Sequence, residues 1–394
     1  MNITFLIGNG FDIGLGLKSR FKDFFPIYKE KSQNKESRIK QLSNSIEENY
    51  DTWADFENAL GKYTLKFTQE NKQDFIDQIK DFEIEFIKYL KSQELTISFK
   101  ESDKICDVML KALTRFYSSD NLAVDSNNAI TKIYNKFSAE SHMYNFVNFN
   151  YTSLLSRVLQ TIPQNIICKR KYNESSDRID KIGKIIHVHG YCDMMPIIGV
   201  NDESQIANKE LAKDARFTRY IIKPSMNQFL RQGHDRDATN VINSSTIICV
   251  YGMSLGATDR KWWDLLMRWL SENNNRQLVL FEYDDQYSPT TPYGWLEKED
   301  VIMDKLISYN SHKGLIVENM RSRIHIAVHK NIFQMKLKIK KDDSDGNLKK
   351  KINTIPVTVD FALKHSDEFA FASQLADEIS TAQQEEKKFE LLIE

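Results

Sequence analysis

Four short polar clusters contain the residue types that could do chemistry in this chain. Each follows an apolar segment directly, and together they read Gly8-Asn9-Gly10-Phe11-Asp12, Asn148-Phe149-Asn150-Tyr151, His187-Val188-His189-Gly190 and Tyr251-Gly252-Met253-Ser254. A histidine suits a general base near neutral pH, and an Asn amide suits the orientation of a water or a carboxamide. A carboxylate can accept a hydrogen bond from a hydroxyl group. The clusters therefore offer these groups to one ligand, provided that the fold brings them together.

The first cluster is a glycine turn that follows a predicted strand, Ile3 to Ile7. Four of the chain's 14 glycines fall in or just after it: Gly8, Gly10, Gly14 and Gly16. A glycine turn after a strand is typical of doubly wound α/β proteins that hold a nucleotide phosphate. The spacing differs from G-x-G-x-x-G, because the third glycine would fall at Ile13, and the lysine-bearing phosphate loop is absent. A nucleotide site and a plain tight turn both remain open here.

Composition excludes several classes of protein. The chain has 394 residues and a formal net charge of −1, so no basic field predicts a nucleic-acid partner. Its four cysteines form no C-x-x-C pair, and we predict neither a metal site nor a disulfide framework. No apolar segment approaches the ~20 residues that a membrane span needs, and no signal peptide precedes the first strand. We therefore expect a cytoplasmic protein.

Further strands are predicted by apolar runs at Tyr144 to Phe149, Lys184 to Val188, Thr246 to Tyr251, Gln277 to Tyr283 and Arg323 to His329. Continuous apolar runs indicate strands that are buried on both faces. Helical patterns such as residues 259–270 lie between them. The predicted fold class is α/β, with a Rossmann-like, open, mostly parallel sheet. Because ligands bind at the carboxyl ends of such strands, the four clusters should meet at one edge of the sheet.

A large helical insertion, about residues 18–145, is predicted after the first strand. Apolar residues recur there at three- and four-residue steps: Phe75, Ile76, Ile79, Phe82, Phe86 and Leu90. This spacing is typical of an amphipathic helix. Trp53 and Phe56 read as core residues, whereas Glu57, one turn from Trp53, is a candidate to face a cleft.

We predict an α/β domain over residues 1–334 and a C-terminal extension over residues 335–394. The extension reads as a hairpin around Asp345-Gly346, followed by a charged helix over 366–394. Its lysine run, Lys336 to Lys351, is typical of a solvated face.

Five motifs, in this order, produce a family resemblance: GNGFDIGLGL, W-x-x-F-E (Trp53, Phe56 and Glu57), FNYT, HVHG and YGMS. With them the chain resembles the AbiH family of bacterial phage abortive-infection proteins over most of residues 1–330. The resemblance implies antiviral defence, in which an effector kills or arrests the infected cell.

The same order of motifs is remotely similar to sirtuin-like NAD-binding domains and NAD hydrolases. That similarity implies NAD as substrate or ligand and makes Asn150 and His189 catalytic. We add Asp12, whose carboxylate could hydrogen-bond a ribose or the attacking water. The ligand-binding residues expected from these motifs are Gly8, Asn9, Gly10, Phe11, Asp12, Tyr151, Gly190, Gly252 and Ser254.

Two departures from the sirtuin-like pattern matter. Asn9 stands where the glycine loop usually has alanine, and the zinc-binding cysteine pairs of protein deacylases are missing, which argues against deacylation. The expectation is hydrolysis of the glycosidic bond of NAD, which releases nicotinamide through an oxocarbenium-like ribose.

Alternatives remain open for single residues and for the whole protein. His189 could be a strand-end histidine bonded to backbone, Asn150 and Ser254 could cap helices, and His187 should point away from His189. The protein could be a nucleotide-binding sensor without turnover, or an effector that targets nucleic acid through Lys336 to Lys351. A homo-oligomer or a partner defence protein could use the helical insertion or the C-terminal extension.

Overall fold

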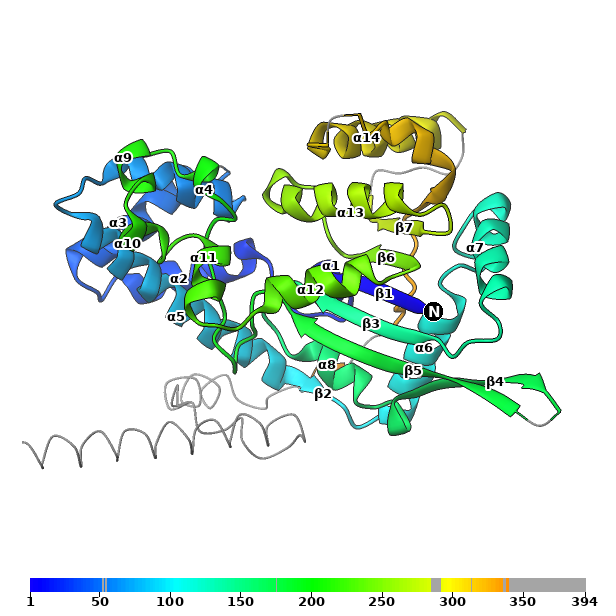
Figure 1. The fold of residues 1–394 in the computed structure, drawn as a ribbon. Coiled ribbons are helices and arrows are strands. Elements are labelled where there is room, and N and C mark those ends of the chain that lie inside the picture. The colour runs from blue at the N-terminus through cyan, green and yellow to red at the C-terminus, as the bar shows by residue number, and fades with distance from the viewer. Residues whose placement is uncertain are drawn as a thin grey trace, which may run out of the picture. The chain divides into compact units, whose positions relative to one another are not determined.

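The structure is a computed structural model (Figure 1), and it describes residues 1–51, 53, 55–174, 176–284, 292–312, 314–335 and 338–339. The hairpin and the charged helix that we predict after residue 335 lie outside the described residues, apart from residues 338–339.

A seven-stranded, mostly parallel sheet forms the centre of the fold. Its strands follow the order β4-β5-β3-β1-β6-β7-β8, and every neighbouring pair is parallel except β4 and β5. The strands are β1 (Asn2–Ile7), β3 (Met143–Asn148), β4 (Ile166–Asn173), β5 (Ser176–His187), β6 (Ile247–Tyr251), β7 (Gln277–Glu282) and β8 (Ile324–Val328). The predicted mixed α/β class with a mostly parallel sheet is confirmed.

The sequence-based prediction missed β4 and the first two thirds of β5, residues 176–183. Most residues of β4 are exposed or half-buried, because it is the edge strand of an antiparallel pair. Such a strand lacks the continuous apolar run that identified the buried strands.

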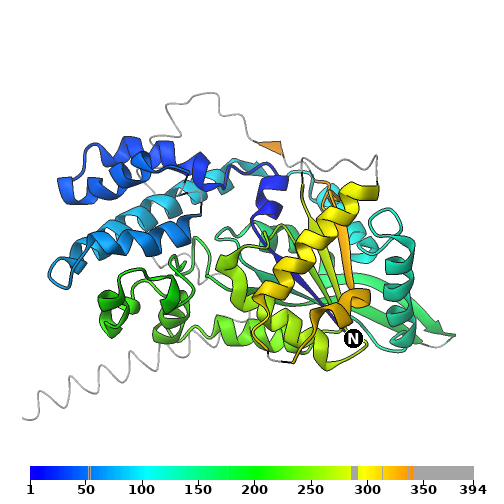
Figure 2. The same cartoon turned by 90° about the horizontal axis from the view of Figure 1, so that it is seen from above.

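Helices cover both faces of the sheet because successive β1 side chains point to opposite sides. Phe5 and Ile7 belong to one hydrophobic core, and Leu6 belongs to the other. The first core includes α1 (Gly10–Gly14), α6 (Ser102–Arg115), α7 (Val124–Lys136) and α8 (Leu154–Leu159). The second includes α12 (His234–Asn243), α13 (Arg260–Glu272) and α14 (Pro292–Tyr309). Figure 2 shows α14 lying across the sheet.

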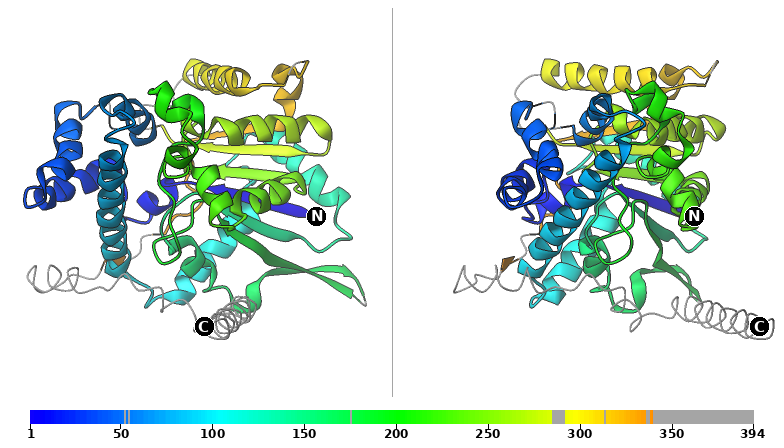
Figure 3. Two further views of the ribbon diagram at one scale, coloured as in Figure 1. Left: turned by 60° about the vertical axis from the view of Figure 1, so that its left-hand side comes forward. Right: turned by 90° about the vertical axis from the view of Figure 1, so that its left-hand side faces the viewer.

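A separate helical part has a core of its own. Its core is built by α2 (Phe21–Ser32), α3 (Ser37–Glu48), α4 (Phe56–Tyr63) and α5 (Lys72–Thr96), together with α9 (Lys209–Ala212) and α10 (Ala215–Thr218). The helix α11 (Lys223–Phe229) follows the core residues Ile221 and Ile222 directly. Residues before β3 and residues after β5 therefore build one helical part. The carboxyl ends of the parallel strands point toward it (Figures 1 and 3).

Aromatic packing fixes α4 against α5 in the helical part. The rings of Phe56 and Phe82 stack with centroids 4.6 Å apart, and Phe24 contacts Phe82 edge-on at 5.2 Å. The predicted amphipathic spacing on α5 is confirmed, since Phe75, Ile79 and Phe82 are buried. This packing sets the position of Glu57, the neighbour of Phe56.

The remaining elements are short. They are β2 (Ile97–Ser98), which pairs with β9 (Lys338–Ile339), and the 3₁₀ helices η2 (Thr64–Lys66), η3 (Pro163–Asn165), η4 (Glu203–Gln205), η5 (Ala257–Asp259) and η6 (Val317–Arg323). Within the described ranges, no helix has the length and apolar character needed to cross a bilayer.

Candidate functional site

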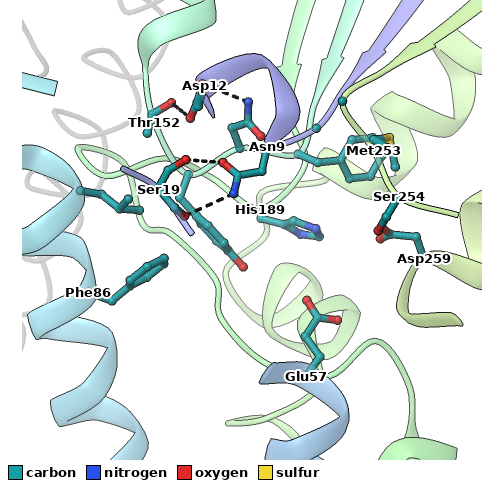
Figure 4. Close-up of a pocket in the computed structure, with 16 residues that line it drawn as sticks. Asn9, Asp12, Ser19, Glu57, Phe86, Thr152, His189, Met253, Ser254 and Asp259 are labelled. Atoms are coloured by element: carbon teal, nitrogen blue, oxygen red, sulfur yellow. Dashed lines mark hydrogen bonds between the residues drawn. The ribbon is translucent and has the colours of Figure 1, made fainter. Parts of the chain in front are cut away.

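A pocket lies where the strand ends meet the helical part (Figure 4), with a cavity volume of about 260 Å³. Eight of the predicted site residues line it: Gly8, Asn9, Asp12, Asn150, Tyr151, His189, Gly252 and Ser254. The other lining residues are Ser19, Glu57, Phe86, Leu90, Phe149, Thr152, Met253 and Asp259. Three predicted binding residues, Gly10, Phe11 and Gly190, are not among the lining residues.

The glycines after β1 allow its loop to touch the loop after β6. The Gly8 amide donates to the Tyr251 carbonyl at 2.9 Å, and the Gly10 amide donates to the Gly252 carbonyl at 2.8 Å. A Cβ on Gly8 would lie 2.6 Å from the Gly252 oxygen, and one on Gly10 would lie 2.6 Å from the Gly252 Cα. Both amides are engaged within the protein, so close packing of two loops accounts for these glycines.

The three residues outside the pocket have evident packing roles. Phe11 is 1% exposed, and its ring meets Phe333 edge-on with centroids 5.3 Å apart. Gly10 lies against Gly252, as described above. Gly190 has a φ of +66°, a conformation that glycine adopts without strain, and it turns the chain after β5.

Asp12 is the centre of a buried hydrogen-bond network. Its two carboxyl oxygens accept from Thr152 Oγ1 at 2.6 Å and from Asn150 Nδ2 at 3.2 Å. Burial raises the pKa of Asp12 to about 7, because desolvation outweighs the hydrogen bond from Thr152. The pocket thus contains a carboxyl group that titrates near neutral pH.

Asn150 and His189 each present a buried polar atom without a partner. Asn150 is 4% exposed and His189 is 7% exposed. Within the part of the chain that the structure describes, Asn150 Oδ1 and His189 Nδ1 have no hydrogen-bond partner. Buried polar atoms are almost always paired in folded proteins. Two unpaired atoms in the walls of one pocket indicate that a ligand or water completes them.

His189 is held in its neutral form. Burial keeps its pKa well below the ordinary value, and the nearby Lys223 charge lowers the pKa further. Its ring stacks on Tyr151 at 6.0 Å and meets Phe149 edge-on at 5.9 Å. A neutral imidazole has one nitrogen free to accept a proton.

His187 is not among the residues that line the pocket. Its Nδ1 lies 3.3 Å from Asn148 Nδ2, and its Nε2 lies 2.8 Å from Ser156 Oγ. Asn148 Oδ1 accepts from the Asn150 amide, so the Asn148 nitrogen must face the histidine. His187 therefore accepts at Nδ1 and donates from Nε2 to Ser156. This tautomer cannot activate the serine as a nucleophile.

Asn9 fixes the start of the helical part. Its Oδ1 accepts from Ser19 Oγ at 2.5 Å, and its Nδ2 donates to the Ser19 carbonyl at 3.3 Å. An alanine at this position could make neither bond. Asparagine in place of the usual alanine therefore ties the glycine loop to Ser19.

The helical part places Glu57 at the pocket with two donors behind it. The Glu57 carboxylate pairs with the buried ammonium of Lys223 and accepts from Asn201 Nδ2 at 3.1 Å. Across the pocket, burial and the Glu57 charge raise the pKa of Asp259 to about 7. Sequence reasoning singled out Glu57 but missed Lys223, Asn201 and Asp259, because nothing in the local sequence links single polar residues so far apart.

No described residues form an evident metal centre: among them, no group of three or more His, Cys, Asp or Glu residues is placed to hold a metal ion. The polar groups that line the pocket are amide, imidazole, hydroxyl and carboxyl groups, and Phe86, Phe149 and Tyr151 add three aromatic rings.

Fold and site together define an α/β protein with a polar pocket at the carboxyl ends of its parallel strands. A family model, Bacteriophage abortive infection AbiH, matches residues 4–281, and the chain belongs to this family. The matched range contains every residue that lines the pocket. No curated protein matches the chain.

Proposed function

We propose that this protein is an abortive-infection effector that binds NAD in the pocket and hydrolyses its nicotinamide–ribose bond. The defence role follows from the AbiH family. The nucleotide and the reaction are inferred from the strand order and from the groups in the pocket.

The strand order supports a dinucleotide ligand. When the parallel strands alone are counted in chain order, β5, β3, β1, β6, β7 and β8 are arranged 3-2-1-4-5-6. This is the order of Rossmann folds, which bind dinucleotides where the order reverses. The reversal falls between β1 and β6, and the loops after both strands line the pocket.

The observation that carries the proposal is the pair of unpaired buried atoms, Asn150 Oδ1 and His189 Nδ1. The Asn150 amide nitrogen donates a hydrogen bond to Asp12. The amide oxygen of Asn150 is left to accept a hydrogen bond from a water or from the nicotinamide carboxamide. His189 is neutral, so its unpaired nitrogen can accept a hydrogen bond from that water or from a ribose hydroxyl. It can also take the acidic proton of a water that has bonded to C1′. Asp12 acts through Asn150 and Thr152, as a positioning residue.

The reaction needs little acid catalysis. The C1′–N bond breaks and its electron pair goes to the pyridinium nitrogen, so nicotinamide leaves as a neutral molecule. A water oxygen bonds to C1′ of the oxocarbenium-like ribose. The proton of that water passes to His189 and then to solvent, and the second product is ADP-ribose.

The test is nicotinamide release from NAD by the full-length protein, alone and in extracts of phage-infected cells. We expect His189→Gln and Asn150→Ala to lower the rate by about 100-fold, the size of a general-base or positioning contribution. His329→Asn is the matched control, because His329 is exposed, lies outside the pocket, and has a φ of 54° that Asn tolerates.

The absence of turnover under every one of these conditions would overturn the proposed hydrolysis. If NAD then still raised the melting temperature, the protein would be a nucleotide sensor without turnover. Equal rates for wild type and His189→Gln would remove His189 from the mechanism.

A further inference from the structure

The pocket walls are acidic and aromatic. Three carboxylic acids line the pocket, namely Asp12, Glu57 and Asp259, and none of its lining residues is a lysine or an arginine. Phe86, Phe149 and Tyr151 supply aromatic rings. Such walls attract a cationic planar group and repel an anion when their carboxyl groups are ionised. Burial raises the pKa of Asp12 and of Asp259 to about 7, so both add their negative charge above neutral pH.

Glu57 is the best-defined of the three acids. Lys223 and Asn201 hold its two oxygens from behind, so the side chain has a fixed position. Figure 4 shows the carboxylate directed into the pocket, toward His189. Because Lys223 is 2% exposed and is not a lining residue, a ligand meets the carboxylate rather than the ammonium group.

The size of the cavity limits how much of a dinucleotide it can hold. About 260 Å³ is below the range of roughly 300–1,000 Å³ that is typical of pockets that hold a whole drug-sized ligand. The Gly8 and Gly10 amides, which could have met a phosphate, already donate to carbonyl groups of the β6 loop. One end of the ligand therefore fits, and the phosphates are disfavoured inside.

A second observation, independent of the acidic residues, also indicates a ligand in this cavity. Asn150 and His189 are both more than nine-tenths buried, and each has an unpaired polar atom among the described residues of the wall. Asn150 Oδ1 can accept from a carboxamide NH₂ group, which the nicotinamide ring carries.

We propose that the pocket takes the positively charged nicotinamide–ribose end of NAD⁺, and that Glu57 selects this cationic end while the phosphates remain at the mouth. The inference rests on the proposed function and names the part of the substrate that is recognised. The positive charge moves to the ribose when the bond breaks, so the same carboxylate stabilises the oxocarbenium-like ribose.

Calorimetric titration of the full-length protein with four compounds tests this selection. The compounds are 1-methylnicotinamide, which is cationic and has no glycosidic bond, neutral nicotinamide, NAD⁺ and NADH. We expect the cation to bind about tenfold tighter than nicotinamide and NAD⁺ about tenfold tighter than NADH, a preference of about 1.4 kcal/mol. Equal affinities within either pair would overturn the inference without any variant.

Two variants assign the selection to the acidic wall. Two affinity ratios measure the selection: 1-methylnicotinamide over nicotinamide, and NAD⁺ over NADH. Glu57→Gln should bring both ratios close to one, whereas Glu47→Gln should leave them unchanged. Glu47 is a matched control because it also pairs with a lysine, Lys29, but lies outside the pocket. Retained selectivity in folded Glu57→Gln would overturn the role of Glu57.

Glu57→Gln leaves the buried Lys223 without its ion-pair partner, so folding is checked by circular dichroism. If the variant is unfolded, Asp259→Asn takes its place, and it should lower both ratios by about threefold. Unchanged ratios in Asp259→Asn would then remove Asp259 from the selection, and the titration of the wild type with the four compounds decides the inference. Nicotinamide release without cation selectivity refutes only this inference, and cation selectivity without release refutes only the proposed hydrolysis.

Discussion

Asp12 determines which atoms of the pocket are available to a ligand. Its carboxyl group accepts hydrogen bonds from the amide nitrogen of Asn150 and from the hydroxyl of Thr152. The amide oxygen of Asn150 is therefore directed away from Asp12 and has no partner among the described residues. The carboxyl group is buried, which favours its protonated form and raises its pKa to about 7. The residue therefore orders the site and also makes the stability of the fold sensitive to pH.

The sign of that sensitivity follows from proton binding. Between about pH 4 and pH 7 the folded chain keeps the Asp12 proton, whereas the unfolded chain releases it. The free energy of unfolding must then fall as pH rises through this window, and level off above about pH 7.

We predict that Asp12→Asn removes this dependence. The melting temperature of the variant minus that of wild type should increase from pH 4 to pH 8, since each pKa unit corresponds to about 1.4 kcal/mol. Asp103→Asn, at an exposed position on α6, serves as the control and should show a flat difference. A flat difference for Asp12→Asn as well would mean that Asp12 is ionised in the fold well below neutral pH.

At the scale of elements, backbone hydrogen bonds join the loop after β1 to the end of β6 and the loop that follows it, a contact that we call the loop lock. Hydrogen bonds run from Gly8 to Tyr251, the last residue of β6, and from Gly10 to Gly252, the residue that follows it. Gly252 has a φ of +71°, which L side chains rarely adopt. The loop lock continues the pairing of the two strands and sets the floor of the pocket between them.

We predict that Gly8→Ala loosens the loop lock. The new Cβ would lie 2.6 Å from the Gly252 oxygen, a backbone atom that cannot rotate away, so the free energy of unfolding should fall by about 1–3 kcal/mol. Gly14→Ala is the control, because its Cβ would meet only the Tyr251 hydroxyl, at 3.9 Å. Denaturant midpoints measure both, and equal midpoints for Gly8→Ala and wild type would refute the loop lock.

At the scale of the whole molecule, the pocket belongs to two parts of the structure. The sheet contributes the loops after β1, β3, β5 and β6, and the helical part contributes Glu57, Phe86 and Leu90. Neither part alone encloses the pocket. A change in how the helical part packs would alter the pocket without altering the sheet.

We predict that this architecture acts during phage infection, as membership of the AbiH family indicates. Bacteria that express the protein should lose NAD after infection and release fewer phage, whereas bacteria that express His189→Gln should do neither. NAD measured at intervals, together with phage titre, checks this outcome. Protection with an unchanged NAD level would separate the defence role from the proposed reaction.

Continuous apolar runs located β1, β3, β6, β7 and β8 to within one residue at each end, because burial on both faces leaves a local signature. They located only the C-terminal end of β5. The exposed edge strand β4 has no such signature and was missed. The order of the polar clusters also indicated one shared edge of the sheet, since parallel strands end on the same side.

The sequence by itself determined the class of fold, the family, and which polar clusters follow the strands. Tertiary structure alone decided that Glu57 meets Lys223 and Asn201, that Gly8 and Gly10 pack on Gly252, and that Phe11 faces the core. Local periodicity encodes which side of a helix or strand is buried. Pairing between single polar groups more than a hundred residues apart has no period, so only the folded chain reveals it.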